Sequence, residues 1–273
     1  MSEAPPTAEA TDDLAERGAL AVRERPVTLV DQALSAALWT AGLSWMIPLM
    51  GSMMAAGLVK ESDETDWLNR LYCRGQLALT GARWNAVVDP AIDPGRSYVF
   101  CQNHVNLLDH VTMYCATPHF KQGLELADHF DIPVYGWFMR QRGTIPVYKG
   151  RRDAFDKLTE GFAREVAKGH SILAFPEGTR SRTGRVGKFR KGVFMAAAEL
   201  GIPVVPVSVT GMYEILRPGT KLFRPGHEVT VHCDAPIETE GLSAGEVAAL
   251  ARRVQAVVSG RVDRYWEGRV DGA

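Results

Sequence analysis

The chain has 273 residues, of which 46% are hydrophobic and 23% charged, a composition typical of a globular protein. Its length allows one large domain or two small ones. The net charge of −1 excludes the broad positive field of nucleic-acid-binding proteins, so we expect no nucleic-acid partner. The four cysteines show no metal-ligand spacing, and we expect reduced thiols in a cytoplasmic protein; they are Cys73, Cys101, Cys115 and Cys233.

Residues 1–26 are rich in Ala, Glu, Asp, Pro and Thr with few large apolar side chains, which predicts a disordered N-terminus. They lack the basic start and short apolar run of a secretory signal. Residues 27–60 differ, because the 28 residues 32–59 carry no charge and include two tryptophans and four methionines. One continuous helix of that length would reach roughly 42 Å, more than the roughly 30 Å of a hydrocarbon core.

Helix breakers interrupt this apolar segment. Pro48 removes a helix hydrogen bond and clashes with the preceding turn, and Gly42, Gly51 and Gly57 lower the helix propensity. We therefore expect two short apolar helices that dock in the membrane interface, where tryptophan is favoured. A single membrane span and a buried helical hairpin are the alternatives.

Apolar runs alternate with amphipathic segments over residues 61–273. Pro146 favours a sheet edge for its run, while Asp153 and Ser243 are candidate helix N-caps. The alternation predicts an α/β fold class, with a central, largely parallel sheet flanked by helices in one domain. Strands are expected at 97–101, 144–148, 172–175, 204–209 and 229–231. Helices are expected at 107–113, 154–168, 192–200 and 243–264.

A histidine and an aspartate follow the first predicted strand. His104 precedes Asp109 by five residues, and Asn103 stands directly before the histidine. A neutral imidazole is a suitable general base near pH 7, and a carboxylate on its second nitrogen fixes the tautomer. A helix-capping aspartate near an ordinary loop histidine would give the same spacing. Asn103 is expected to hold the loop through hydrogen bonds between its side chain and the backbone.

A second polar segment, Phe175–Ser181, follows the run 172–175. It places Glu177 and Arg180 around a Gly-Thr turn. The two side chains could form a structural ion pair. Alternatively, Arg180 binds a phosphate as a bidentate fork, while Glu177 binds hydroxyl groups or positions Arg180.

The two segments, about 70 residues apart and in this order, resemble the glycerolipid acyltransferase family, best known from 1-acylglycerol-3-phosphate O-acyltransferases. Two further blocks agree with the resemblance. Gly143–Lys149 is similar to the second family block, and Ile202–Val207 is similar to the fourth, whose role is mostly structural. The resemblance covers residues 98–211 well.

The resemblance implies that a fatty acyl group moves from acyl-CoA or acyl carrier protein to a hydroxyl of a glycerophosphate lipid precursor. Lysophosphatidic acid is the expected acceptor and phosphatidic acid the product. His104 is then the base and Asp109 orients it. The implied substrate-binding residues are Glu177, Gly178, Thr179, Arg180, Lys149, Lys188 and Arg190, and the motif-supporting residues are Asn103, Ser181 and Pro206.

The resemblance also implies a place in phospholipid synthesis. We expect a protein on the cytoplasmic face of the cell membrane, attached through residues 32–59. No bound cofactor and no catalytic metal are expected, since the histidines form no metal-like pattern. The basic run 188–191 is either a solvated surface or a phosphate contact, to the acceptor or to a donor such as coenzyme A.

Two departures from the family leave the acceptor open. Lys149 closes a block that usually ends in arginine, and residues 124–130 contain no lysine where many lysophosphatidate acyltransferases have one. Glycerol 3-phosphate or another lysolipid is therefore an alternative acceptor. A hydrolase or transacylase using the same base is a further alternative. A non-catalytic membrane-bound scaffold is the alternative of another class, against which the intact polar residues of both segments argue.

Overall fold

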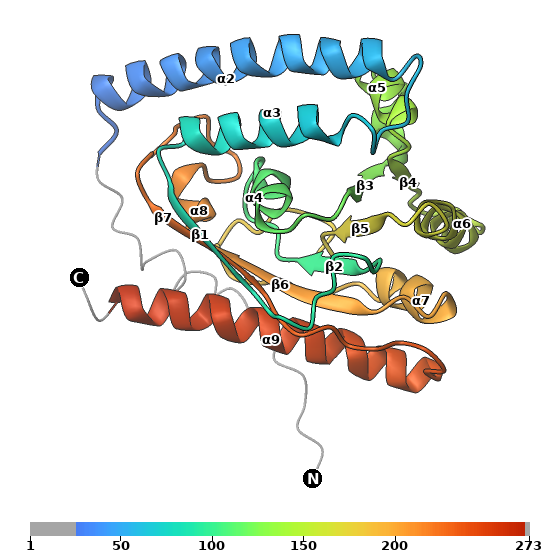
Figure 1. Cartoon of the computed structure of the whole chain (residues 1–273). Coiled ribbons are helices and arrows are strands. Elements are labelled where there is room, and N and C mark those ends of the chain that lie inside the picture. Colours follow the sequence, from blue (N-terminus) through green and yellow to red (C-terminus); the bar gives the residue numbers. More distant parts are fainter. Residues whose placement is uncertain (1–25, 271–273) are drawn as a thin grey trace.

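The computed structural model describes residues 26–270, so that almost all of the segment expected to be disordered lies outside the described residues. A seven-stranded sheet forms the centre of the fold, in the order β1-β7-β6-β2-β5-β3-β4 (Figure 1). Neighbouring strands are parallel except for β6 and β7. The strands are β1 Arg83–Val88, β2 Val99–Gln102, β3 Lys121–Leu126, β4 Ile145–Val147, β5 Ser171–Ala174, β6 Val204–Thr210 and β7 Glu228–Cys233. The predicted α/β class with a largely parallel sheet is therefore confirmed.

Helices cover both faces of the sheet. In Figure 1, α9 runs along one face with α6 and α7 beside it, while α3 and α4 cover the other and α2 lies outside α3. The helices are α2 Leu29–Ala56, α3 Asp66–Leu79, α4 Asp109–Ala116, the 3₁₀ helix η1 Ala127–Asp131, α5 Tyr135–Gln141, α6 Ala154–Val166, α7 Gly192–Glu199, α8 Met212–Ile215 and α9 Ala244–Val270.

The three central strands are buried along their whole length. In β2, Phe100 lies opposite Leu173 of β5 and Val205 of β6, and every residue of the three strands is buried. A strand covered by helices on both faces favours a continuous apolar run, which explains why all three could be predicted.

Two strands escaped prediction because they are not apolar runs. β1 is an edge strand with five of its six residues exposed, and β3 carries Lys121, Gln122 and Glu125. The edge position expected from Pro146 is confirmed, since β4 ends the sheet on the other side. The predicted cap of α9 is also confirmed, since the Glu246 amide donates to Ser243 Oγ at 3.4 Å and the Ser243 amide donates to the Glu246 carboxylate at 2.8 Å.

The expected break at Pro48 is wrong: α2 is one helix of 28 residues that contains the proline. Its start is fixed by a capping box, in which the Asp31 amide donates to Thr28 Oγ1 and the Thr28 amide donates to the Asp31 carboxylate. A proline costs a helix about 3 kcal/mol, an amount that tertiary packing can offset.

Glycines in this region permit close packing of α2 on α3 rather than ending helices. A Cβ atom added to Gly75 would lie 2.0 Å from the indole nitrogen of Trp45, so only glycine admits that ring. The same indole N–H donates to the Tyr72 carbonyl at 3.2 Å, and Gln76 Nε2 donates to the Gly42 carbonyl at 2.9 Å. These contacts hold the middle of α2 along α3.

The outer face of α2 remains exposed. By length and composition the helix could cross a membrane, and only 6% of its most apolar stretch is buried. Large apolar side chains account for this surface: Leu29, Val30, Leu34, Leu43 and Ile47 are exposed.

A fully buried lysine lies at the start of β3. Lys121 Nζ donates to the Thr117 and His119 carbonyls at 3.3 and 3.0 Å, and it lies 5.5 and 5.3 Å from the ring centres of Phe100 and Tyr114. Burial, with a smaller contribution from nearby Arg70, lowers the pKa of Lys121 to about 7. The ammonium form is therefore less favoured in the folded chain than in the unfolded one.

We predict a specific pH dependence of stability from this lysine. Between pH 7 and its unfolded pKa the unfolded chain binds more protons, so the free energy of unfolding should rise with pH. From pH 7 to pH 9 the wild type should gain about 2 kcal/mol relative to Lys121→Met, measured by urea unfolding at each pH. A constant difference between the two proteins over this range would contradict the lowered pKa.

Candidate active site

The strand order brings the two polar segments together. β2 and β5 are parallel neighbours, with Cys101 opposite Ala174. The loop that follows β2 and the turn that follows β5 therefore leave the same edge of the sheet. Ligand sites in α/β folds commonly lie at such an edge.

His104 and Asp109 form the predicted pair. The His104 Nδ1 and Asp109 Oδ2 atoms are 2.8 Å apart, and the same carboxylate oxygen accepts the amide N–H groups of Val105 and Asn106 at 2.6 and 2.8 Å. The Asp109 side chain is 0% exposed, whereas that of His104 is 23% exposed. Because an ionised carboxylate can only accept, the proton lies on Nδ1 and the second ring nitrogen is free to act as a base.

Two asparagines fasten this loop to its surroundings. Asn103 exchanges two hydrogen bonds with Val209 of β6, donating from Nδ2 at 2.9 Å and accepting at Oδ1 at 2.7 Å. The side-chain to backbone bonding expected of Asn103 is thus present. Asn106, which the sequence analysis did not select, donates to the Met212 and Leu216 carbonyls at 2.6 and 3.0 Å. Its only signal in the sequence is an amide side chain between apolar residues.

Glu177 connects the second segment to the first. Its Oε1 accepts the His104 amide and its Oε2 accepts the Gly187 amide, both at 2.8 Å. The Ser181 amide donates to the His104 carbonyl at 2.7 Å, and the Phe175 ring stacks on the His104 ring with centres 4.2 Å apart. The backbone and the imidazole of His104 are therefore both held by the segment after β5.

The Glu177 carboxylate is buried at 6% exposure. Burial raises its pKa above the usual value, although the two amide hydrogen bonds partly offset this. Within residues 26–270 the structure shows no ion pair between Glu177 and Arg180, so the carboxylate binds backbone instead. Gly187 allows this approach, since an added Cβ would lie 2.9 Å from Glu177 Oε2.

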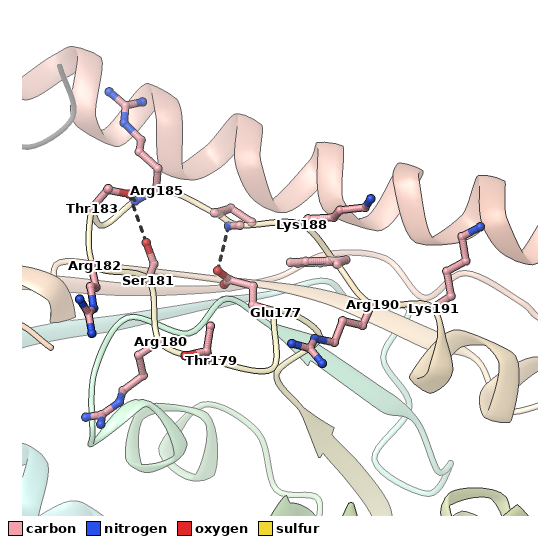
Figure 2. A pocket seen from close by; sticks show the side chains of 13 residues that line it. Glu177, Thr179, Arg180, Ser181, Arg182, Thr183, Arg185, Lys188, Arg190 and Lys191 are labelled. Atoms are coloured by element: carbon pink, nitrogen blue, oxygen red, sulfur yellow. Dashed lines mark hydrogen bonds between the residues drawn. The ribbon is translucent and has the colours of Figure 1, made fainter. Parts of the chain in front are cut away.

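A cationic cavity of about 650 Å³ adjoins this carboxylate (Figure 2). All of its lining residues come from the segment 177–191. The predicted binding residues Glu177, Thr179, Arg180, Lys188 and Arg190 line it, together with Ser181, which was predicted to support the motif. Gly178 lies in the same turn with φ 69°, and an added Cβ there would lie 2.8 Å from Arg190 Nε.

Lys149 and Pro206 lie away from the cavity loop. Lys149 follows β4 at the sheet edge, and Pro206 lies within β6 opposite Cys101, which fits its expected structural role. Two cations of the cavity were not named as binding residues, Arg182 and Arg185, while Lys191 was named only as part of the basic run 188–191. The density of basic residues after Arg180 was their signal in the sequence.

The cavity loop rests on α9. Arg185 Nη1 pairs with Asp263 at 2.7 Å, the Phe189 amide donates to Gln255 at 3.2 Å, and Trp266 donates to the Gly184 carbonyl at 3.2 Å. The other five cations have no carboxylate partner within the described chain. The residues described here also contain no group of three or more His, Cys, Asp or Glu side chains that could hold a metal ion.

Comparison with known proteins agrees with this geometry. Residues 87–210 match the model of the family described as Acyltransferase, and this match contains both polar segments. Residues 87–210 are an acyltransferase-family domain. The structure of the domain thus places the family's two polar segments around one histidine.

The chain has curated relatives and a structural neighbour. It is 36% identical over 140 residues to a chloroplastic 1-acyl-sn-glycerol-3-phosphate acyltransferase of Brassica napus, covering 51% of this chain and 40% of the relative. A 1-acyl-sn-glycerol-3-phosphate acyltransferase of Saccharomyces cerevisiae is 30% identical over 168 residues, covering 59% and 54%. The chain thus spans about half the length of these relatives or less.

The fold is shared with the crystal structure of the 1-acyl-sn-glycerophosphate (LPA) acyltransferase PlsC from Thermotoga maritima. The TM-score is 0.68 at 22% identity, covering 86% of this chain and 96% of that one.

We predict that Glu177→Gln destabilises the acyltransferase domain by about 1–3 kcal/mol, because an amide NH₂ would replace one of two buried acceptors and face a backbone N–H. Urea unfolding of the purified protein measures this loss. Glu160→Gln, at an exposed ion pair on α6, is the matched control and should change stability by less than about 0.5 kcal/mol. Equal effects of the two substitutions would contradict the role assigned to Glu177.

Proposed function

We propose that this protein is an O-acyltransferase that moves a fatty acyl group from a thioester donor to a hydroxyl of a glycerophosphate lipid precursor. The His104–Asp109 pair carries the proposal: an oriented base, partly open to solvent, beside a cationic cavity. The names of the relatives point to 1-acylglycerol 3-phosphate as the acceptor and phosphatidic acid as the product.

The reaction needs one base and no enzyme nucleophile. The free nitrogen of His104 takes the proton of the acceptor hydroxyl as its oxygen attacks the thioester carbonyl. The tetrahedral intermediate then collapses, the carbon–sulfur bond breaks, and the imidazolium returns the proton to the thiolate. The buried Asp109 carboxylate stabilises the imidazolium between these two steps.

Binding of the acceptor phosphate is assigned to Arg180. Arg180 is exposed and lines the cavity, and the amide of the next residue, Ser181, donates to the His104 carbonyl. A guanidinium offers a planar pair of donors to a phosphate. Glu177 contributes by fixing the turn, and Gly178 allows Arg190 to approach it.

Membrane attachment through α2 completes the proposal. The helix has an exposed apolar face and no charge over residues 32–59, while Trp39 and Trp45 bind carbonyls of the domain. Because those contacts hold the helix along the domain, we favour docking in the plane of the interface over a perpendicular span, at the cytoplasmic face of the cell membrane.

The first test is product formation from palmitoyl-CoA with a panel of acceptors: glycerol 3-phosphate, 1-acyl and 2-acyl lysophosphatidate, and neutral lysolipids. We expect transfer to lysophosphatidate, its loss in His104→Ala, and a fall in kcat of about 10²–10⁴-fold in Asp109→Asn with little change in acceptor KM. Transfer to glycerol 3-phosphate or a neutral lysolipid instead would replace the acceptor. Release of free fatty acid alone would favour a hydrolase, and no turnover by folded, lipid-bound protein would favour a scaffold.

We also predict that Leu43→Asp/Ile47→Asp lowers co-sedimentation with liposomes, because two charges enter the exposed apolar face of α2. Both side chains are exposed, so the fold should persist. Met195→Asp, at an exposed apolar residue of α7, is the matched control and should bind as the wild type does. Unchanged binding of the double variant would remove α2 as the anchor.

A further inference from the structure

The cations of the cavity lie on two sides of the loop that carries them. Figure 2 shows Arg180 and Arg190 pointing away from α9, whereas Lys188 and Lys191 extend along it. Between the two lysines in the chain, the Phe189 amide donates to Gln255 of α9 and so holds this part of the loop against the helix. If Arg180 binds the acceptor phosphate, the second cationic group, Lys188 and Lys191, has no ligand assigned to it.

This second group is not neutralised. Lys188 and Lys191 are exposed and have no carboxylate partner within residues 26–270, whereas Arg185, further along α9, is paired with Asp263. The carboxylate of Glu177 is occupied by two backbone amides. Anions are thus attracted to the α9 side by uncompensated charge.

The group is also held in place. Two residues of α9 hold the loop: Trp266 binds the Gly184 carbonyl before the lysines, and Gln255 binds the Phe189 amide between them. Helix α7 begins directly after Lys191. The first amides of α7 add donors at the end of the loop, where a helix favours negative charge. Fixed donors bind a multiply charged anion with less loss of entropy than mobile ones.

Size and charge identify the ligand class. A cavity of about 650 Å³ has the volume of a small-molecule site, much larger than one phosphate needs. A phosphomonoester carries about −1.5 to −2 charges at pH 7, and coenzyme A combines one with a diphosphate on the same nucleotide. An acyl carrier protein would instead need a broad complementary surface.

We propose that Lys188 and Lys191 bind the adenosine 3′-phosphate and diphosphate end of coenzyme A in the acyl donor, leaving Arg180 and Arg190 to the acceptor phosphate. This rests on the acyltransferase function proposed above. Glu177 joins the two places, since one oxygen holds the His104 amide and the other holds Gly187, the residue before Lys188. The pantetheine arm then leads from the nucleotide to the thioester at His104.

The direct test uses adenosine 3′,5′-bisphosphate, which lacks the arm and the acyl chain, in a calorimetric titration of the full chain. The wild type should bind it, with affinity falling as salt rises. Lys188→Ala/Lys191→Ala should weaken binding about tenfold or more, since charge-assisted contacts are lost. Lys60→Ala/Lys157→Ala removes the same charge from exposed positions elsewhere and should leave binding within about twofold.

Kinetics provide a second readout. The Lys188→Ala/Lys191→Ala variant should raise the KM for palmitoyl-CoA about tenfold and leave the acceptor KM within about twofold, whereas Arg180→Ala should do the reverse. Absent bisphosphate binding, or equal weakening by the control pair, would overturn the proposal even if acyl transfer occurs. Bisphosphate binding that depends on the two lysines, without acyl transfer to any acceptor, would uphold the nucleotide site and refute the acyltransferase function.

Discussion

The site depends on the Glu177 carboxylate, whose two oxygens each accept a hydrogen bond from a backbone amide. His104 and Glu177 are 73 positions apart in the chain, and the 2.8 Å bond between them turns two loops into one site. The second amide, from Gly187, extends the same connection into the cationic cavity. His104, the Glu-Gly-Thr-Arg turn and a basic loop are thus positioned by one buried side chain.

A buried charge of this kind requires compensation. Asp109 and Glu177 lie close to the sheet edge with almost no exposed surface, yet Asp109 receives one imidazole and two amide donors and Glu177 receives two amides. Burial makes each bond stronger than it would be in water and makes each unpaired group costly. The loops therefore have few alternative conformations, and the imidazole is oriented before any substrate arrives.

Much of this arrangement could be predicted from the sequence. The apolar runs of β2, β5 and β6 follow from burial on both faces, and the spacing of His104 and Asp109 suits a base and its orienter. The role of Glu177 could not be predicted, because it depends on which strands are neighbours and on a glycine ten residues later. Local patterns contain no information on strand order.

The continuous helix through Pro48 shows the same limit. Proline and glycine lower local helix propensity, yet the indole of Trp45 packs where Gly75 has no side chain, on a helix 30 residues further on. Tertiary contacts of that kind outweigh propensity and are invisible until the two helices are placed together. β3 was missed for a related reason, since its buried Lys121 interrupts the apolar pattern.

The measurement that tests the central claim most directly is a double-mutant cycle between His104 and Asp109, read as the rate of acyl transfer from radiolabelled palmitoyl-CoA. If Asp109 acts through the imidazole, Asp109→Asn should lower the residual rate of His104→Ala by less than about twofold, although it is strongly damaging on its own. Losses that multiply in the double variant would contradict the account, because they would show that Asp109 acts independently of His104.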